Sequence, residues 1–230
     1  MYAISANNIS KKYISGNQKI ILFNDLSLNV NEGEIISISG QYGSGRTTLL
    51  KMIAAMTPPN HGTIEVFGKD ILTIKRRSDW RLKHIGFLTN KESLIPYFTT
   101  KQHLLMGQND DDLDFEFFNE EAQYILTMLG IDENKLTQYP DQLAKMDRLK
   151  ITVARVLMTN PRLLLIDELA TDLSAEERFS LYSSLVEFAH KQNITIISTE
   201  NYNDCFFDRM YTLKDGKLIE VGKQKQQILH

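Results

Sequence analysis

The chain has 230 residues, of which 42% are hydrophobic and 24% charged, and its formal net charge is −3. This composition is typical of a globular protein, and the slight acidity argues against nucleic acid as the main partner, because nucleic-acid-binding proteins usually carry a basic excess. No apolar run reaches the roughly 18 residues of a membrane-spanning helix. The single cysteine, Cys205, cannot form an internal disulfide, and residues 1–8 lack the features of a signal peptide. We therefore expect a protein of the cytoplasm.

The first elements expected along the chain are strands. Apolar and polar residues partly alternate over 3–13, and residues 20–30 form a second strand-rich stretch. An Asn-Glu-Gly turn at 31–33 precedes residues 34–39, which have the pattern of a buried strand. This third strand leads directly into a glycine-rich segment.

The glycine-rich segment fits the pattern of a phosphate-binding loop at every position except Arg46, where such loops have lysine. Its glycines favour positive-φ backbone that turns successive N–H groups around an anion, and the helix expected next directs its positive dipole end to the same place. Arg46 would reach the β and γ phosphates, and the Thr47 hydroxyl would ligate Mg²⁺. The alternative is a glycine-rich turn with a purely structural role. The predicted nucleotide-binding residues of this segment are Gly40, Gln41, Tyr42, Gly43, Ser44, Gly45, Arg46, Thr47 and Thr48.

The middle of the chain changes from strand to helix and then back. A basic cluster over residues 75–83 and an acidic run over residues 110–116 are both expected to be solvated; anionic lipid headgroups are the alternative for the basic cluster. The order of elements indicates an α/β core with a parallel sheet and an inserted helical region. Strands are expected at 63–67, 85–88, 163–166 and 194–198, helices at 102–106, 120–129, 143–157 and 176–190, and a hairpin at 210–221 that turns at Asp215-Gly216.

Two carboxylates, Asp167 and Glu168, end the buried strand at 163–166. A strand end beside a phosphate-binding loop is where Mg²⁺ needs a hard oxygen ligand, and Asp167 fits that role. Glu168 would polarise an attacking water as the general base. Considered without the loop, the two carboxylates could instead have a purely structural role at the end of the strand. Combined with the loop, the pair predicts a Mg-nucleotide site.

From Ile9 to Gly222 the chain resembles the ATP-binding subunits of ABC transporters, most of all the short subunits of macrolide-export, lipoprotein-release, cell-division and antimicrobial-peptide export complexes. Tyr13 stands where the family has an aromatic residue that stacks on adenine. Asn90 occupies the position where the family has a glutamine that contacts Mg²⁺ and the attacking water. Residues 171–174, here named the dimer loop, match a loop that contacts a second subunit. The resemblance implies that ATP and Mg²⁺ are the cofactors.

The chain departs from the family at several positions that contact the γ-phosphate. Arg46 replaces lysine, Asn90 replaces glutamine, and Ser174 replaces the usual aspartate of the dimer loop. Glu200 stands at the switch histidine, where an ionised carboxylate would repel the phosphate. The signature Leu-Ser-Gly-Gly-Gln, which would contact ATP held by the opposite subunit, reads Leu143, Ala144, Lys145, Met146 and Asp147. These departures predict impaired hydrolysis, although Asp167 and Glu168 are intact.

The resemblance implies one P-loop NTPase domain of ABC type over residues 1–230. It would have a mainly parallel core (1–89 and 155–230), an antiparallel β subdomain and an inserted helical subdomain (90–154). The partners implied are separate transmembrane permease subunits and a second ATP-binding subunit, in a homodimer or a heterodimer, at the inner face of the cell membrane. A pseudo-ATPase that acts as a structural or regulatory partner is the main alternative. A protein of DNA repair or translation is disfavoured, because the chain has one ATP-binding unit and no basic bias.

Overall fold

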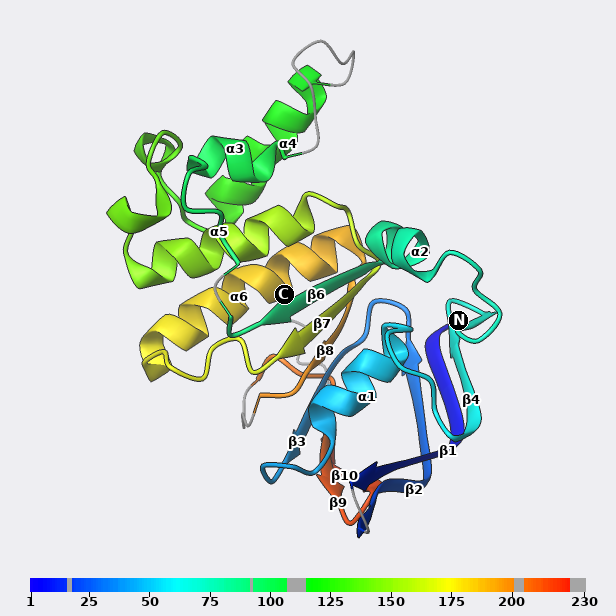
Figure 1. Cartoon of the computed structure of the whole chain (residues 1–230). Helices are drawn as coiled ribbons and strands as arrows, with labels where there is room; N and C mark the ends of the chain where they lie inside the picture. The colour runs from blue at the N-terminus through cyan, green and yellow to red at the C-terminus, as the bar shows by residue number, and fades with distance from the viewer. Residues whose placement is uncertain (16–17, 92, 107–114, 201–204, 224–230) are drawn as a thin grey trace.

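A computed structural model describes the chain except for residues 16–17, 92, 107–114, 201–204 and 224–230 (Figure 1). Residues 110–114 of the acidic run therefore lie outside the described residues. The described chain forms two sheets and a group of helices, and the expected α/β fold with a mainly parallel sheet is confirmed. None of the described helices is both long enough and apolar enough to cross a membrane.

The central sheet has six strands in the order β10-β9-β3-β8-β7-β6, and all neighbours are parallel except β9 and β10. Along β7, Leu163 and Leu165 pack in one core and Leu164 and Ile166 in the other, because successive side chains point to opposite faces. Burial on both faces explains the continuous apolar runs in these strands. The strands are β3 (Ile35–Gly40), β6 (Ile85–Thr89), β7 (Leu163–Asp167), β8 (Thr195–Ser198), β9 (Arg209–Lys214) and β10 (Lys217–Lys223).

A four-stranded antiparallel sheet, in the order β2-β1-β4-β5, covers one side of the central sheet. Helix α1 (Arg46–Ile53) lies between the two sheets in Figure 1, and its Leu49 and Met52 share a core with residues of both. Packing between two sheets fixes α1, and therefore the loop that precedes it. The strands are β1 (Tyr2–Ser15), β2 (Gln18–Asn31), β4 (His61–Val66) and β5 (Lys69–Asp70).

The other face of the central sheet is covered by helices α5 and α6, and Figure 1 shows α3 and α4 extending beyond them. Apolar residues of α5 and α6 form one core with Leu164 and Ile166 of the sheet. The helical elements of this part are α3 (Thr100–Leu104), α4 (Phe115–Met128), η1 (Glu133–Lys135), η2 (Pro140–Gln142), α5 (Lys145–Leu157) and α6 (Ala175–Gln192). The expected division at residues 89–90 and 154–155 stays a prediction.

Two features were not expected from the sequence. Residues 69–70 form a short strand, β5, that pairs with β4. Helix α2 (Arg77–His84) contains much of the basic cluster, and none of its residues is fully buried. A helix that buries no residue completely leaves no apolar periodicity to detect.

The N-termini of α5 and α6 differ in capping. The Ser174 hydroxyl accepts a hydrogen bond from the Glu177 N–H, and Glu177 reaches back to the Ser174 N–H, which completes a capping box on α6. Ala144 occupies the same position on α5 and has no side-chain cap. The first N–H groups of α5 therefore lack the hydroxyl acceptor that α6 has.

We predict that Ala144→Ser stabilises the chain by about 1 kcal/mol, because serine accepts from the first turn of α5. Chemical denaturation checks this, and the melting temperature should rise by roughly 2–4 °C for a chain of this size. Ser174→Ala is the matched control and should lose about the same amount. If Ala144→Ser does not raise the stability but Ser174→Ala lowers it, α5 needs no hydroxyl cap.

Candidate nucleotide site

The phosphate-binding loop, residues 40–47, connects the end of β3 to α1. Gly43 and Gly45 have φ of 80° and 105°, so both need the left-handed conformation that glycine permits. The expectation of a positive φ was wrong for Gly40. Its small size serves close packing instead, since an added Cβ would lie 2.8 Å from both the Leu213 carbonyl oxygen and Ser44 Oγ. Residues 41–43 are exposed at the loop tip, beside a cavity of about 400 Å³.

Asp167 lies at the end of β7 and accepts hydrogen bonds from two hydroxyl groups. The Thr47 and Thr199 hydroxyls each donate to Asp167 Oδ1 at 3.0 Å. Asn90 follows Thr89, which is paired with Asp167 in the parallel register of β6 and β7. The fold thus brings the three predicted Mg²⁺ ligands to one edge of the sheet. Their hard oxygens suit Mg²⁺, which keeps several waters in sites with few protein ligands.

The Arg46 guanidinium is hydrogen-bonded to the residues that follow β7 and β8. Its Nη2 donates to Glu168 Oε1 and its Nη1 to the Thr199 carbonyl oxygen, each at 2.6 Å, and the side chain is 9% exposed. The planar fork of guanidinium reaches two acceptors at once, which an ammonium group on a shorter stem does less well. Contact between Arg46 and a phosphate stays a prediction. For that contact the guanidinium would have to break its hydrogen bond to Glu168, or bind the phosphate and Glu168 together.

Glu200, at the switch position, lies inside the fold. Its side chain is buried, at 4% exposure, and its Oε1 accepts a hydrogen bond of 2.6 Å from the Ala170 N–H. Burial raises the pKa of Glu200, against the opposing influence of that N–H and of the positive charges of Arg178 and Arg46. The carboxyl group is thus enclosed by the protein, and its effect on a γ-phosphate stays a prediction.

The signature segment, residues 143–147, contacts other parts of the same chain. Asp147 pairs with Lys135 at 2.6 Å, and Lys145 pairs with Asp172 of the dimer loop at 3.6 Å. Leu143 is buried, and Met146 packs on the helical core. The segment is tied to the dimer loop, while its contact with a nucleotide held by a second subunit stays a prediction.

Tyr13 lies on the strand pair that borders the phosphate-binding loop. The ring is 43% exposed, and Lys11 Nζ lies 5.2 Å from its centroid while donating to the Pro58 carbonyl oxygen. Lys11 is paired with Phe23 in the sheet, and an added Cβ on Gly45 would lie 2.8 Å from the Phe23 ring. Stacking of adenine on Tyr13 stays a prediction.

Sequence analysis missed Thr199 as a member of the site. Its carbonyl oxygen accepts from Arg46, and its hydroxyl contacts Asp167 and accepts from the Glu168 N–H at 3.2 Å. A polar residue just after a buried strand was the available signal. Its importance depends on the order of strands in the sheet, which places β8 between β3 and β7.

Comparisons with known proteins agree with this geometry. A sequence profile of the family described as "ABC transporter" matches residues 23–171. The lipoprotein-releasing system ATP-binding protein LolD of Rickettsia typhi is 31% identical over 212 residues, covering 91% of this chain and 94% of that protein. A methionine import ATP-binding protein of Bacillus thuringiensis is 29% identical over 224 residues, covering 96% of this chain and 66% of that protein.

A solved structure with the same fold is the dimeric post-hydrolysis state of an ATP-binding cassette bound to ADP and Pi. It aligns with a TM-score of 0.83 over 96% of this chain and 99% of that chain, at 24% sequence identity. At this identity the likeness establishes the fold.

The raised pKa of Glu200 predicts how its replacement changes stability. A raised pKa means that the fold favours the protonated form, so the stability contributed by Glu200 is present below its unfolded pKa of about 4.3 and is lost as pH rises through the folded pKa. Glu200→Gln keeps an acceptor oxygen without the ionisation. The variant should therefore gain stability over the natural chain at about pH 8, with the gain shrinking as pH falls. Urea unfolding across this range checks the sign; an equal difference at every pH would contradict it.

Proposed function

The chain belongs to the ABC transporter family, and from this membership we propose that it is the ATP-binding subunit of a transporter whose membrane-spanning subunits are separate chains. The single observation that carries the proposal is the Thr47–Asp167 hydrogen bond, which joins a phosphate-binding loop to the carboxylate expected to serve Mg²⁺. Residues 120 positions apart in the chain meet there, as a Mg-nucleotide site requires.

In the proposed complex, the N–H groups of residues 41–47 and the N-terminus of α1 hold the phosphates. Thr47, Asp167 and Asn90 are the Mg²⁺ ligands, directly or through water, and Tyr13 stacks on the base. When bound, Mg²⁺ would neutralise charge on the phosphate oxygens. Glu168 is the general base that accepts a proton from the attacking water.

Hydrolysis is proposed to be slow because Arg46 engages Glu168. A carboxylate oxygen that accepts a 2.6 Å hydrogen bond from guanidinium is less available to accept a proton from water. Phosphoryl transfer depends on positioning and on charge stabilisation, so displaced groups lower the rate sharply. The same contact favours the alternative, a pseudo-ATPase that binds nucleotide without turnover.

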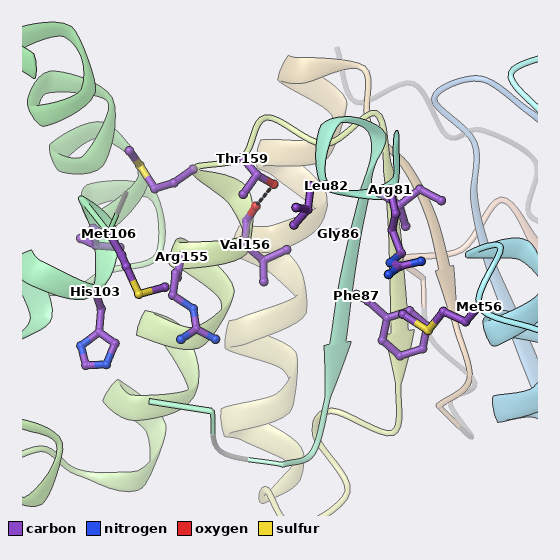
Figure 2. Close-up of a pocket in the computed structure, with 13 residues that line it drawn as sticks. Met56, Arg81, Leu82, Gly86, Phe87, His103, Met106, Arg155, Val156 and Thr159 are labelled. Carbon is purple, nitrogen blue, oxygen red and sulfur yellow. Dashed lines mark hydrogen bonds between the residues drawn. The ribbon is translucent and has the colours of Figure 1, made fainter. Parts of the chain in front are cut away.

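A groove of about 500 Å³ is the proposed docking place for a membrane subunit. Figure 2 shows His103, Met106 and Arg155 of the helical region on one side, and Met56, Arg81 and Phe87 on the other. Unbranched, polarizable methionine side chains adapt to different partner surfaces. Docking there would hold the chain at the inner face of the cell membrane.

A second ATP-binding subunit is the other proposed partner. Dimeric ATP-binding cassettes with this fold support a dimer. The family resemblance implies that the loop of one subunit would face the signature of the other. A homodimer would have two sites with the altered signature. A heterodimer with a complete subunit would restore a normal signature opposite this chain's loop.

We predict that Arg46→Lys raises the rate of phosphate release about tenfold or more, since lysine cannot bridge Glu168 and the Thr199 carbonyl with a planar fork. Steady-state phosphate release at saturating Mg-ATP is the measurement. An unchanged rate would transfer the cause of slow turnover to the altered signature.

The companion variant is Glu168→Gln. It should lower residual release by about 100-fold or more, because amide cannot act as the base, while the Kd for ATP measured by calorimetry stays within a few-fold. Full activity in this variant would remove Glu168 from its proposed role.

For the groove, we predict that Leu82→Glu releases the chain from the membrane fraction of its own cells. Leu82 is 67% exposed and lines the groove, so the substitution places a charge in a partly apolar contact. Leu72→Glu is the control, because Leu72 is 45% exposed and is not a lining residue. Membrane association that survives Leu82→Glu, or that Leu72→Glu abolishes equally, would contradict docking in the groove.

A further inference from the structure

The turn that follows β7 carries Glu168 in a strained conformation. Glu168 has φ of 52°, in the left-handed region that residues with a Cβ rarely adopt. Such a conformation persists only where surrounding contacts fix it. The Glu168 carboxylate therefore depends on whatever holds residues 168–171.

Among the described residues, three hydrogen bonds between a side chain and the backbone of the turn hold it in place. The Glu168 N–H donates to Thr199 Oγ1 at 3.2 Å, and the Thr171 hydroxyl donates to the Glu168 carbonyl oxygen at 2.9 Å. The Ala170 N–H donates to Glu200 Oε1 at 2.6 Å, the shortest of the three. Two of the three partners, Thr199 and Glu200, are consecutive residues after β8, so one short segment supports the turn.

Glu200 is itself held by a chain of hydrogen bonds that leads to α6. Its backbone N–H donates to Ser198 Oγ at 3.3 Å, and that hydroxyl is hydrogen-bonded to the Tyr182 hydroxyl of α6 at 2.8 Å. Tyr182 is 2% exposed and Glu200 is 4% exposed, so both side chains are buried. A buried acceptor held this firmly imposes its position on the amide that it binds.

We propose that Glu200 is a positioning residue, which holds the turn of residues 168–171 and thereby places the Glu168 carboxylate to accept a proton from the attacking water. The proposal rests on the proposed function of Glu168 and adds a role for the residue at the switch position. Glu200 acts on the reaction through the Ala170 amide and does not contact the nucleotide. It should therefore affect turnover and leave nucleotide affinity unchanged.

The test compares Glu200→Gln, which keeps an acceptor oxygen, with Glu200→Leu, which removes it. Glu200→Leu should lower kcat for ATP about 100-fold, because a small misplacement of a reacting group costs about that much, with KM unchanged within about twofold. Glu200→Gln should retain kcat within about threefold. Glu187→Leu is the matched control. Glu187 is exposed on α6, and its described partner is Lys191, one turn further along the same helix.

Hydrogen exchange provides a readout that does not need hydrolysis. In Glu200→Leu the amide of Ala170 should exchange at least about tenfold faster than in the natural chain, while Glu200→Gln and Glu187→Leu leave it protected. If the chain hydrolyses no ATP, the proposed function loses its enzymatic part and exchange still decides the positioning role.

Three results would overturn the proposal. The first is a protected Ala170 amide in Glu200→Leu. The second is a large change of KM in either Glu200 variant, which would mean that the side chain contacts the nucleotide. The third is a faster kcat in Glu200→Leu, which would mean that the carboxylate repels the phosphate as the sequence first suggested.

Discussion

The contact between the Arg46 guanidinium, the Glu168 carboxylate and the Thr199 carbonyl oxygen is the interaction on which the site depends. It joins the start of α1, the end of β7 and the end of β8 in one partly buried cluster. A buried cation is costly unless it is paired and hydrogen-bonded, and these acceptors meet part of that need. The same contact engages the proposed general base, so the stability of the site and its catalytic competence oppose each other.

The fold makes that contact possible through the order of its strands. β8 lies between β3 and β7, so residues that follow the three strands meet at one edge of the sheet. Helix α1 is fixed between two sheets by its apolar residues, which in turn fixes the loop before it. Polar hydrogen bonds then set the fine geometry, with Asp167 receiving two hydroxyls and the turn at Glu168 held by residues 199 and 200.

Much of the fold could be predicted from the sequence, because buried parallel strands, the glycine loop and the hairpin at Asp215-Gly216 each leave a local pattern. The meeting of Thr47 with Asp167 also followed from two recognisable motifs. The direction of Arg46 could not be predicted, since its acceptors lie 122 and 153 residues away and depend on the strand order. Burial of Glu200 was missed because a carboxylate is expected outside, and helix α2 was missed because it buries no residue completely.

The most direct test of the account is a calorimetric titration of the purified chain with Mg-ATP, with phosphate release followed on the same sample. The account predicts saturable binding with one site per chain and slow release of phosphate. Binding shows that the loop accepts the nucleotide despite Arg46, and slow release is the result expected when Arg46 engages Glu168. Absence of binding, or binding with release as fast as the median enzyme turnover of about 10 s⁻¹, would contradict it.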